Sequence, residues 1–391
     1  MGLLLPHARC SACLDERQVI YSQQREGPAG PFCFTDFRRD TTLQHNKPLR
    51  LAINGYGRIG RCFLRALLES TAATRMQIVA INEPANLDSM AYLTRYDSTH
   101  GRFPGGVEVI GDALHIDGRE ILVSHARHPE DVDWAALEID LLIEASGCYG
   151  RRHELQRFLD AGCPRLLLSH PANSGGDVDA TIVTGINSDA LTGRERLVSA
   201  ASCTTNAIVP VLELLEREVG VDHVLLTTLH SVMNDQPLID GYHHDDLRRT
   251  RSAMQSIIPV STGLARGVER LLPKLSGKVS AKAIRVPTLN VSAIDLTIST
   301  QRPVSAQEIN DLLAEAAKGP LAGLLAYSEA AHASVDFNHD AHSAIVDGSQ
   351  TRTAGPHLVN LFVWFDNEWG FANRMLEVAD HWAHLWTSAH S

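Results

Sequence analysis

A mostly apolar segment that runs directly into closely spaced glycines constrains the fold of this chain more than any other feature. Leu49–Asn54 leads into a Gly-x-Gly-x-x-Gly turn at residues 55–60, and an amphipathic stretch follows over residues 60–70. Glycines permit a tight turn and let a ligand approach the backbone closely. The helix that follows offers free N–H groups and a partial positive charge to a phosphate. The segment therefore predicts a strand, a phosphate-binding turn and a helix.

The next apolar run indicates which nucleotide binds there. Met76–Asn82 ends at Glu83, where a dinucleotide site places a carboxylate beside the ribose. A carboxylate accepts hydrogen bonds from ribose hydroxyls and repels a 2′-phosphate, and no Arg occurs at residues 84–86. A structural turn in another α/β protein and a solvent-facing Glu are the alternatives. The order of strand, turn and helix favours an NAD site.

Apolar runs alternate with helical stretches over residues 48–202, which predicts a parallel sheet of Rossmann type and an α/β fold. Longer runs with few helices between them follow over residues 203–366, which predicts an α+β catalytic domain with a mixed or antiparallel sheet. An amphipathic helix at residues 370–385 can return to the first domain, so residues 367–391 are expected to complete it. The expected strands are Leu49–Asn54, Met76–Asn82, 141–145, 165–169, 180–185, 224–230, 283–286, Ser292–Thr300 and Leu358–Phe365.

Composition excludes several classes of protein. The 46 acidic residues outnumber the 35 Lys and Arg, and the net charge of −11 argues against nucleic acid or an anionic membrane surface as partner. No run approaches the roughly 18 apolar residues that span a bilayer. The seven cysteines are scattered and odd in number, which fits reduced thiols in the cytoplasm better than a disulfide framework.

Residues 1–47 differ from the rest of the chain. They mix Pro, Gly, Arg, Gln and Asp without a sustained period, which predicts a poorly ordered leader. Cys10 and Cys13 form a Cys-x-x-Cys pair, but no second pair follows at zinc-ribbon spacing. No metal site is therefore predicted.

Cys203 and His230 are the candidate nucleophile and base. Cys203 stands where a loop enters a helix expected over residues 205–219, and the positive end of a helix favours a thiolate. Its Ser and Thr neighbours argue against an apolar burial site. His230 ends an expected strand, from which an imidazole can stabilise the thiolate and move a proton. A buried structural Cys is the alternative, and the chain offers 19 histidines from which to choose.

Several motifs, in order from about Leu49 to Trp386, resemble the glyceraldehyde-3-phosphate dehydrogenase family. Independent motifs in the same order make the resemblance specific, and only the leader lies outside it. The matching segments are residues 54–61, 202–206, 227–230, 246–249, 257–263, 285–288 and 364–370.

The resemblance implies roles for individual residues. Cys203 matches the nucleophile, His230 matches the residue that activates it, and no metal is implied. The residues that match the NAD site are Gly55, Gly57, Arg58, Ile59, Gly60, Glu83, Arg127 near the adenine, and Asn367 at the nicotinamide carboxamide. Those that match the anion-binding groups of a small phosphorylated aldehyde are Ser202, Thr204, Arg249, Thr262, Gly263 and Arg285. The resemblance also implies a homotetramer, in which the loop at 233–248 reaches a neighbouring subunit.

Within the family, the chain most resembles the branch that oxidises D-erythrose 4-phosphate. Residues 169–180, 335–340 and 343–352 are similar to that branch. Met233 stands where glycolytic members usually place a phosphate-binding Thr, and a thioether cannot donate a hydrogen bond. The implied product is 4-phosphoerythronate, formed by hydrolysis of a Cys203 thioester for pyridoxal 5′-phosphate (vitamin B6) biosynthesis.

Three other functions stay open on the sequence. One is a phosphorylating glyceraldehyde-3-phosphate dehydrogenase of glycolysis, because nothing in the sequence excludes phosphate as the acyl acceptor. Another is a semialdehyde dehydrogenase with the same two-domain plan. The arginines Arg249 and Arg285 argue against it, because they favour a phosphorylated substrate. The third is a non-catalytic NAD-binding regulator, and the retention of Cys203 and His230 argues against it.

Deletion of residues 1–47 tests the interpretation of the leader. We expect the truncated protein to keep the NADH-forming activity of the full chain, because no site motif lies before residue 49. The measurement is the initial rate at equal protein concentration. A collapse of activity would show that the leader belongs to the catalytic unit.

Overall fold

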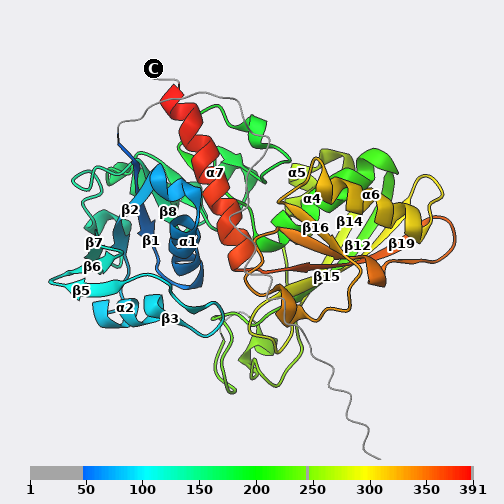
Figure 1. The fold of residues 1–391 in the computed structure, drawn as a ribbon, viewed down its shortest axis with the longest axis horizontal. Coiled ribbons are helices and arrows are strands. Elements are labelled where there is room, and N and C mark those ends of the chain that lie inside the picture. The colour runs from blue at the N-terminus through cyan, green and yellow to red at the C-terminus, as the bar shows by residue number, and fades with distance from the viewer. Residues whose placement is uncertain (1–46, 244–245, 389–391) are drawn as a thin grey trace, which may run out of the picture. The chain divides into compact units, whose positions relative to one another are not determined.

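The computed structural model describes residues 47–243 and 246–388. The expectations for the leader and for Cys10 and Cys13 lie outside the described residues, except at Lys47. Two large sheets dominate what is described, and Figure 1 shows each with its own helices.

The first sheet has nine strands in the order β10-β11-β9-β8-β1-β2-β7-β6-β5. The strands from β10 to β7 are parallel, whereas β5, β6 and β7 form an antiparallel meander at one edge. The strands are β1 (Leu49–Asn54), β2 (Met76–Asn82), β5 (Val107–Ile110), β6 (Ala113–Ile116), β7 (Arg119–Ser124), β8 (Leu141–Glu144), β9 (Leu166–Leu168), β10 (Ala180–Thr181) and β11 (Leu197–Ser199). A small ribbon of β3 (Tyr96–Asp97) and β4 (Gly101–Arg102) lies outside the sheet.

The helices of the first sheet include one from the far end of the sequence. They are α1 (Arg58–Glu69), α2 (Leu87–Arg95), α3 (Arg152–Asp160) and α7 (Trp369–Ser388). Helix α7, red in Figure 1, packs against α1, and its Met375 and Trp382 share one buried core with Phe63 and Leu67. The helix expected at residues 370–385 therefore packs on the first domain.

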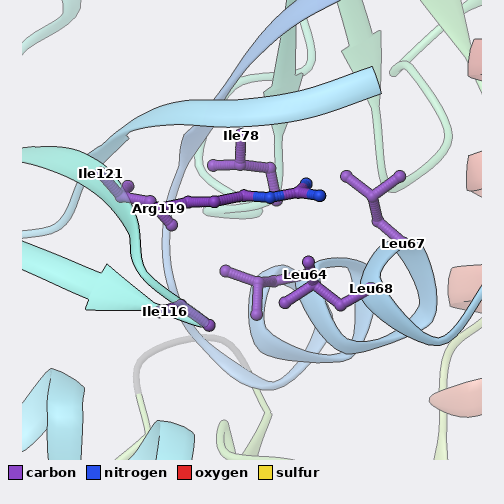
Figure 2. A pocket seen from close by; sticks show the side chains of 7 residues that line it. All are labelled: Leu64, Leu67, Leu68, Ile78, Ile116, Arg119 and Ile121. Atoms are coloured by element: carbon purple, nitrogen blue, oxygen red, sulfur yellow. The ribbon is translucent and has the colours of Figure 1, made fainter. Parts of the chain in front are cut away.

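This core is closely filled. The space between α1 and the strands β2, β6 and β7 amounts to about 10 Å³, and Arg119 extends along it among leucines and isoleucines (Figure 2). Such a volume holds at most one water molecule. This gap is therefore too small for a small-molecule ligand.

The second sheet is mixed and follows the order β13-β14-β12-β15-β19-β17-β16, with β18 paired to β19. Pairs β12–β14 and β16–β17 are parallel, and the other pairs are antiparallel. The strands are β12 (Val221–His230), β13 (Ile258–Val260), β14 (Val279–Arg285), β15 (Ser292–Thr300), β16 (Leu325–Ser328), β17 (Ala344–Asp347), β18 (Arg352–Thr353) and β19 (Leu358–Phe365).

Helices cover one face of the second sheet. Figure 1 shows α4 (Cys203–Glu218), α5 (Leu264–Leu271) and α6 (Ala306–Lys318) on the same side, and all three contribute to one apolar core. On the opposite face Leu225 and Leu358 remain exposed at 48% and 41%. One-turn helices lie at Thr71–Thr74, Pro129–Asp131, Gly175–Asp177, Ser188–Ala190, Leu247–Thr250, Pro273–Leu275, Ser334–Phe337 and Gly348–Gln350. No helix among the described residues combines the length and apolar character needed to cross a bilayer.

The expected fold class, a Rossmann domain with an α+β catalytic domain, is confirmed. The strand expected at 180–185 is wrong beyond Thr181, because the Asn187 side chain donates to the Thr181 carbonyl oxygen and accepts from the Val183 N–H where strand pairing would continue. The antiparallel meander was not expected. Its strand β5 alternates buried and exposed side chains at the edge of the sheet, which gives only a weak apolar signal.

A buried polar network ties together the carboxyl ends of four parallel strands of the first sheet. Asn54 donates from Nδ2 to Glu144 Oε2 over 2.5 Å, and Asn82 donates to Asn54 Oδ1 over 2.7 Å. Ser124 completes the row by donating to Asn82 Oδ1 over 2.8 Å. Burial raises the pKa of the Glu144 carboxyl to about 7, although its hydrogen bonds from Ser146 and Asn54 act in the opposite direction. The network fixes the edge at which the glycine-rich turn begins.

This network predicts a pH dependence of stability. A carboxyl whose pKa is higher in the folded state binds more protons there, so its contribution is complete below pH 4.5 and is lost as pH rises through about 7. The loss is at most about 3 kcal/mol, at 1.36 kcal/mol for each pKa unit.

Denaturant unfolding between pH 5 and pH 8 measures the effect. We expect Glu144→Gln to be less sensitive to pH than wild type, whereas Glu120→Gln, at an exposed position on β7, follows wild type. Equal pH slopes for all three proteins would contradict the assignment.

Candidate active site

The turn at residues 55–60 has the backbone geometry that its glycines predict. Gly55 has φ of +88°, and a β-carbon there would lie 2.5 Å from the Ser146 backbone. A β-carbon on Gly60 would lie 2.3 Å from the carbonyl oxygen of Gly55. At Gly57, by contrast, nothing within the described residues lies within 4 Å of an added β-carbon. The first and third glycines serve packing, and the second leaves the backbone open to a ligand.

Two charged side chains, Glu83 and Arg58, make contacts that fix the position of this turn. Glu83 accepts a hydrogen bond from the Tyr56 N–H over 2.7 Å, which holds its carboxylate beside the turn. Arg58 directs its guanidinium away from the turn into ion pairs with Asp97 and Glu368. The backbone N–H groups of Arg58 and Ile59 begin helix α1, where a phosphate can bind. Arg127 is exposed just beyond β7, on the carboxyl side of the same sheet.

Cys203 is the first residue of α4. Ser202 caps the helix by accepting a hydrogen bond from the Thr205 N–H over 3.1 Å. Ala201, just before the cap, is buried with φ of +59°, a conformation that costs a non-glycine residue free energy. Asn206 holds this tight turn by donating to the carbonyl oxygens of Ala200 and Ser202 over 2.8 and 2.9 Å.

Strand register brings His230 to the cysteine. His230 ends β12, and its Nε2 lies 3.6 Å from Cys203 Sγ. His230 is only 8% exposed. Burial and, secondly, the nearby Arg285 lower the pKa of His230 to about 4.

Two opposing influences act on the Cys203 thiol. Burial raises its pKa, whereas hydrogen bonds from Thr204 and the charge of Arg285 lower it. The backbone N–H of Cys203 itself, at the start of α4, also acts to lower it, in the direction expected for a helix N-terminus.

Arg285 and Thr204 contact the pair, and the other expected anion-binding groups lie on neighbouring segments of the second domain. Arg285 ends β14 as the register partner of His230, and the charges of Arg249 and Asp235 act on it. Arg249 pairs with Asp235 over 3.2 Å. Thr204 contacts Cys203 Sγ at 3.8 Å. Thr262 and Gly263 precede α5, where the Thr262 hydroxyl accepts the Leu264 N–H.

Asn367 lies at the end of β19, on the same edge of the second sheet. Its Oδ1 accepts hydrogen bonds from the hydroxyls of Ser231 and Ser292 over 3.0 and 2.8 Å. Both serines are buried. Because Oδ1 is held by two hydroxyls, the orientation of the amide is fixed and its Nδ2 is left as the donor for a ligand.

Two family models match this chain. Residues 49–152 match the model described as glyceraldehyde 3-phosphate dehydrogenase, NAD binding domain. Residues 202–367 match glyceraldehyde 3-phosphate dehydrogenase, C-terminal domain. The two matches together cover more than half of the chain and contain both the glycine-rich turn and the Cys–His pair. The chain belongs to the glyceraldehyde-3-phosphate dehydrogenase family.

Membership makes the chain an NAD-dependent dehydrogenase, and the cofactor is NAD. The residues described above fit it. The open position at Gly57 admits a pyrophosphate against the backbone, and the Glu83 carboxylate lies where ribose hydroxyls can donate to it. The Asn367 amide can donate to a nicotinamide carboxamide.

Sequence reasoning missed a cluster behind the turn. His339 has φ of +69°, and its ring stacks on Trp369 with centroids 3.7 Å apart. His339 Nδ1 lies 3.1 Å from His100 Nδ1, and His100 Nε2 lies 3.0 Å from Glu368. The cluster joins the Arg58 turn to the strand end that carries Asn367. No sequence motif signals it, because its members are remote from one another along the chain.

Paired glycine substitutions test the cofactor site. We expect Gly57→Ala to weaken NAD binding about tenfold or more, because the new methyl group occupies the space left for a pyrophosphate. The melting temperature of the NAD-free protein should stay unchanged, since no described atom opposes that methyl group. Calorimetric titration with NAD and thermal unfolding measure the two effects.

Gly106→Ala is the matched control, because its added β-carbon also has open space but lies far from the turn, beside β5. It should change neither quantity. Unchanged NAD affinity in Gly57→Ala would remove this turn from the cofactor site.

Proposed function

We propose that this protein oxidises D-erythrose 4-phosphate to 4-phosphoerythronate with NAD, through a thioester on Cys203 that water hydrolyses. The observation that carries the chemistry is the Cys203–His230 pair at 3.6 Å, placed beside Arg285. A thiol that a buried imidazole can deprotonate is suited to attack an aldehyde, and a guanidinium beside it is suited to a phosphate.

The residues act as follows. His230 takes the proton of Cys203, and the thiolate attacks the aldehyde carbon to form a hemithioacetal. The Cys203 N–H and the His230 imidazole hold the developing oxyanion, and one such donor is worth about 3–4 kcal/mol of barrier in known cases. Bound NAD supplies the oxidising power by accepting a hydride. His230 first returns its proton to the oxyanion and then removes the hydroxyl proton as the hydride departs, so a thioester remains on Cys203. His230 releases that proton to solvent and takes one from the attacking water, whose oxygen bonds to the carbonyl carbon. The C–S bond breaks, Cys203 leaves as thiolate, and the acid formed loses its proton to solvent.

The identity of residue 233 is evidence for the four-carbon substrate. It is 44% exposed three residues after His230, and its backbone N–H is held by Gln236 Oε1 over 3.1 Å. Its thioether offers no hydrogen bond to a phosphate at the place where glycolytic relatives usually have a Thr. The likeness of residues 169–180, 335–340 and 343–352 to the erythrose branch points the same way.

The proposal also covers the pathway, the cellular compartment and the oligomeric state of the enzyme. Its product would enter pyridoxal 5′-phosphate biosynthesis in the cytoplasm. A homotetramer is what the family resemblance implies, and a subunit contact is supported by the uncovered face of the second sheet, where exposed Leu225 and Leu358 line a groove of about 450 Å³. Exposed apolar surface of this kind fits a subunit contact.

One alternative substrate has a specific observation in its favour. Thr204 contacts Cys203, the charge of Arg249 acts on Arg285, and the chain also retains Thr262; these are groups that can hold inorganic phosphate for attack on a thioester. The protein would then be a phosphorylating glyceraldehyde-3-phosphate dehydrogenase.

NADH formation distinguishes the two. The purified protein is given D-erythrose 4-phosphate or D-glyceraldehyde 3-phosphate, each with and without inorganic phosphate. We expect a higher kcat/KM for the four-carbon sugar and no phosphate requirement. A strict phosphate requirement with preference for the triose would establish the glycolytic reaction instead.

Cys203→Ser tests the nucleophile. We expect turnover to fall by at least about 10³-fold while NAD still binds, because a Ser hydroxyl is a far weaker nucleophile than a thiolate at neutral pH. Cys148→Ser is the matched control, since Cys148 is an exposed free thiol in the first domain. Substantial turnover in Cys203→Ser would refute the thioester.

A further inference from the structure

We propose that Cys62, His100 and Glu368 form a binding site for a thiophilic divalent cation such as Zn²⁺, and that the cation competes with a guanidinium of the cofactor turn for the carboxylate. The site shares no residue with the catalytic cysteine and histidine. It therefore rests neither on the thioester nor on the identity of the aldehyde.

Three segments that are remote along the chain bring the ligand atoms together. Cys62 lies in α1, His100 stands between β3 and β4, and Glu368 directly precedes α7. One sulfur, one ring nitrogen and one carboxylate oxygen of these residues all lie within 4.8 Å of one another. Cys62 is 1% exposed, and the side chains of His100 and Glu368 are 0% and 12% exposed. The described part of the chain holds no second group of three such side chains.

The donor set determines which cation fits. Thiolate, imidazole and carboxylate are the ligands that Zn²⁺ takes in proteins, whereas Mg²⁺ and Ca²⁺ prefer oxygen. Bonds of about 2 Å in a tetrahedron place a nitrogen and an oxygen ligand about 3.3 Å apart. His100 Nε2 already lies 3.0 Å from Glu368 Oε2, so these two atoms have to move little. Three protein ligands leave the fourth position to water.

The surroundings of His100 suit a metal ligand. A ligating imidazole offers one lone pair to the ion and donates its other ring N–H to a neighbour. His100 Nδ1 lies 3.1 Å from His339 Nδ1, which can accept that N–H. His339 Nε2 in turn lies 3.4 Å from Glu69 Oε2, to which it then donates. With a cation at His100 Nε2, every nitrogen of the two neutral rings has a partner.

Without a cation, two neutral rings are less well satisfied. A carboxylate only accepts hydrogen bonds, so His100 Nε2 must then carry the proton that Glu368 accepts. His100 Nδ1 accepts from His339 in that case, and the lone pair of His339 Nε2 faces the carboxylate of Glu69. Two acceptors that face one another repel. Binding of the cation reverses both tautomers and removes this conflict.

The carboxylates around Cys62 oppose its thiolate but favour a cation. Burial raises the pKa of the Cys62 thiol, and the charges of Glu368, Asp366 and Asp97 raise it further, whereas Arg58 lowers it. The same three carboxylates attract a divalent cation. A coordinating thiol is deprotonated by the metal, so the thiol proton leaves to solvent as the bond between sulfur and metal forms.

Arg58 is the group with which the cation competes. Its Nε donates to Glu368 Oε1 over 2.7 Å, and its Nη2 pairs with Oε2, the oxygen that also contacts His100. A cation on Oε2 takes that oxygen from the guanidinium. Arg58 then keeps its pair with Asp97 but loses a contact that fixes the cofactor turn. Cation and NAD should therefore weaken the binding of one another by the same factor.

Metal binding is measured on the full-length protein carrying Cys203→Ser, because the Cys203–His230 pair offers a second thiol and imidazole to a metal. Titration with Zn²⁺ against a chelating dye gives affinity and stoichiometry. Co²⁺ in place of Zn²⁺ reports a thiolate ligand through its charge-transfer absorption. We expect addition of Cys62→Ser to lower the Zn²⁺ stoichiometry by one equivalent and to remove the absorption that belongs to that equivalent.

Two further variants are added to the same parent protein. Cys163→Ser is the matched control, because Cys163 is also a buried free thiol but lies in a different apolar core, and it should bind as much metal as the parent. His100→Gln should weaken binding at least about tenfold. Its amide can still donate to Glu368, so the pairing of the carboxylate with Arg58 is retained. Equal affinity and stoichiometry in the parent, Cys62→Ser and His100→Gln would overturn the site.

Calorimetric titration with NAD tests the competition. We expect saturating Zn²⁺ to weaken NAD binding about tenfold in the Cys203→Ser parent, and to have no effect once Cys62→Ser is added. An NAD affinity that Zn²⁺ leaves unaltered in the parent would show that Arg58 keeps both contacts with Glu368 and would reject the competition. Neither measurement uses an aldehyde, so failure of the proposed oxidation and failure of the metal site are distinguishable.

Discussion

The register between β12 and β14 is the constraint on which the catalytic half depends. Because the two strands are parallel and end together, the imidazole of His230 and the guanidinium of Arg285 emerge side by side. The antiparallel partner β15 begins at the same edge, and Ser292 from that strand orients the Asn367 amide. A shift of one residue in β12 would turn the imidazole to the opposite face of the sheet. The reacting groups thus depend on backbone pairing along the whole length of three strands.

The NAD-binding half depends on the close approach of backbone segments to one another, and less on the pairing register of its strands. Gly55 and Gly60 allow the turn to pack against Ser146 and against itself, and the buried row from Glu144 to Ser124 holds the strand ends beneath it. Glu368, the residue after Asn367, accepts hydrogen bonds from Arg58 of the turn and contacts His100. The glycine-rich turn and the segment that carries Asn367, which we expect to meet the two ends of the dinucleotide, are therefore connected by direct contacts.

The sequence predicted the parts with strong local signals. Strands β1, β2, β15 and β19 have the bounds that their apolar runs indicate, and Cys203 begins a helix as expected. What it could not provide were contacts between remote segments. Neither the left-handed Ala201 nor the His339–Trp369 stack has a local pattern, because each is imposed by neighbours far along the chain. Burial of Cys203, which raises the pKa of its thiol, likewise has no local signal in the sequence.

Helix α7 has a consequence for how the protein is made. The core of the first sheet includes Met375 and Trp382, yet all strands of the second sheet precede them in the chain. The catalytic half is therefore synthesised before the first half can bury the face of α1 that packs against α7. Until α7 is synthesised, Phe63 and Leu67 lack part of their cover. The nascent NAD-binding half is therefore exposed to chaperones and to aggregation while the 169 residues between β11 and α7, and then α7 itself, are translated.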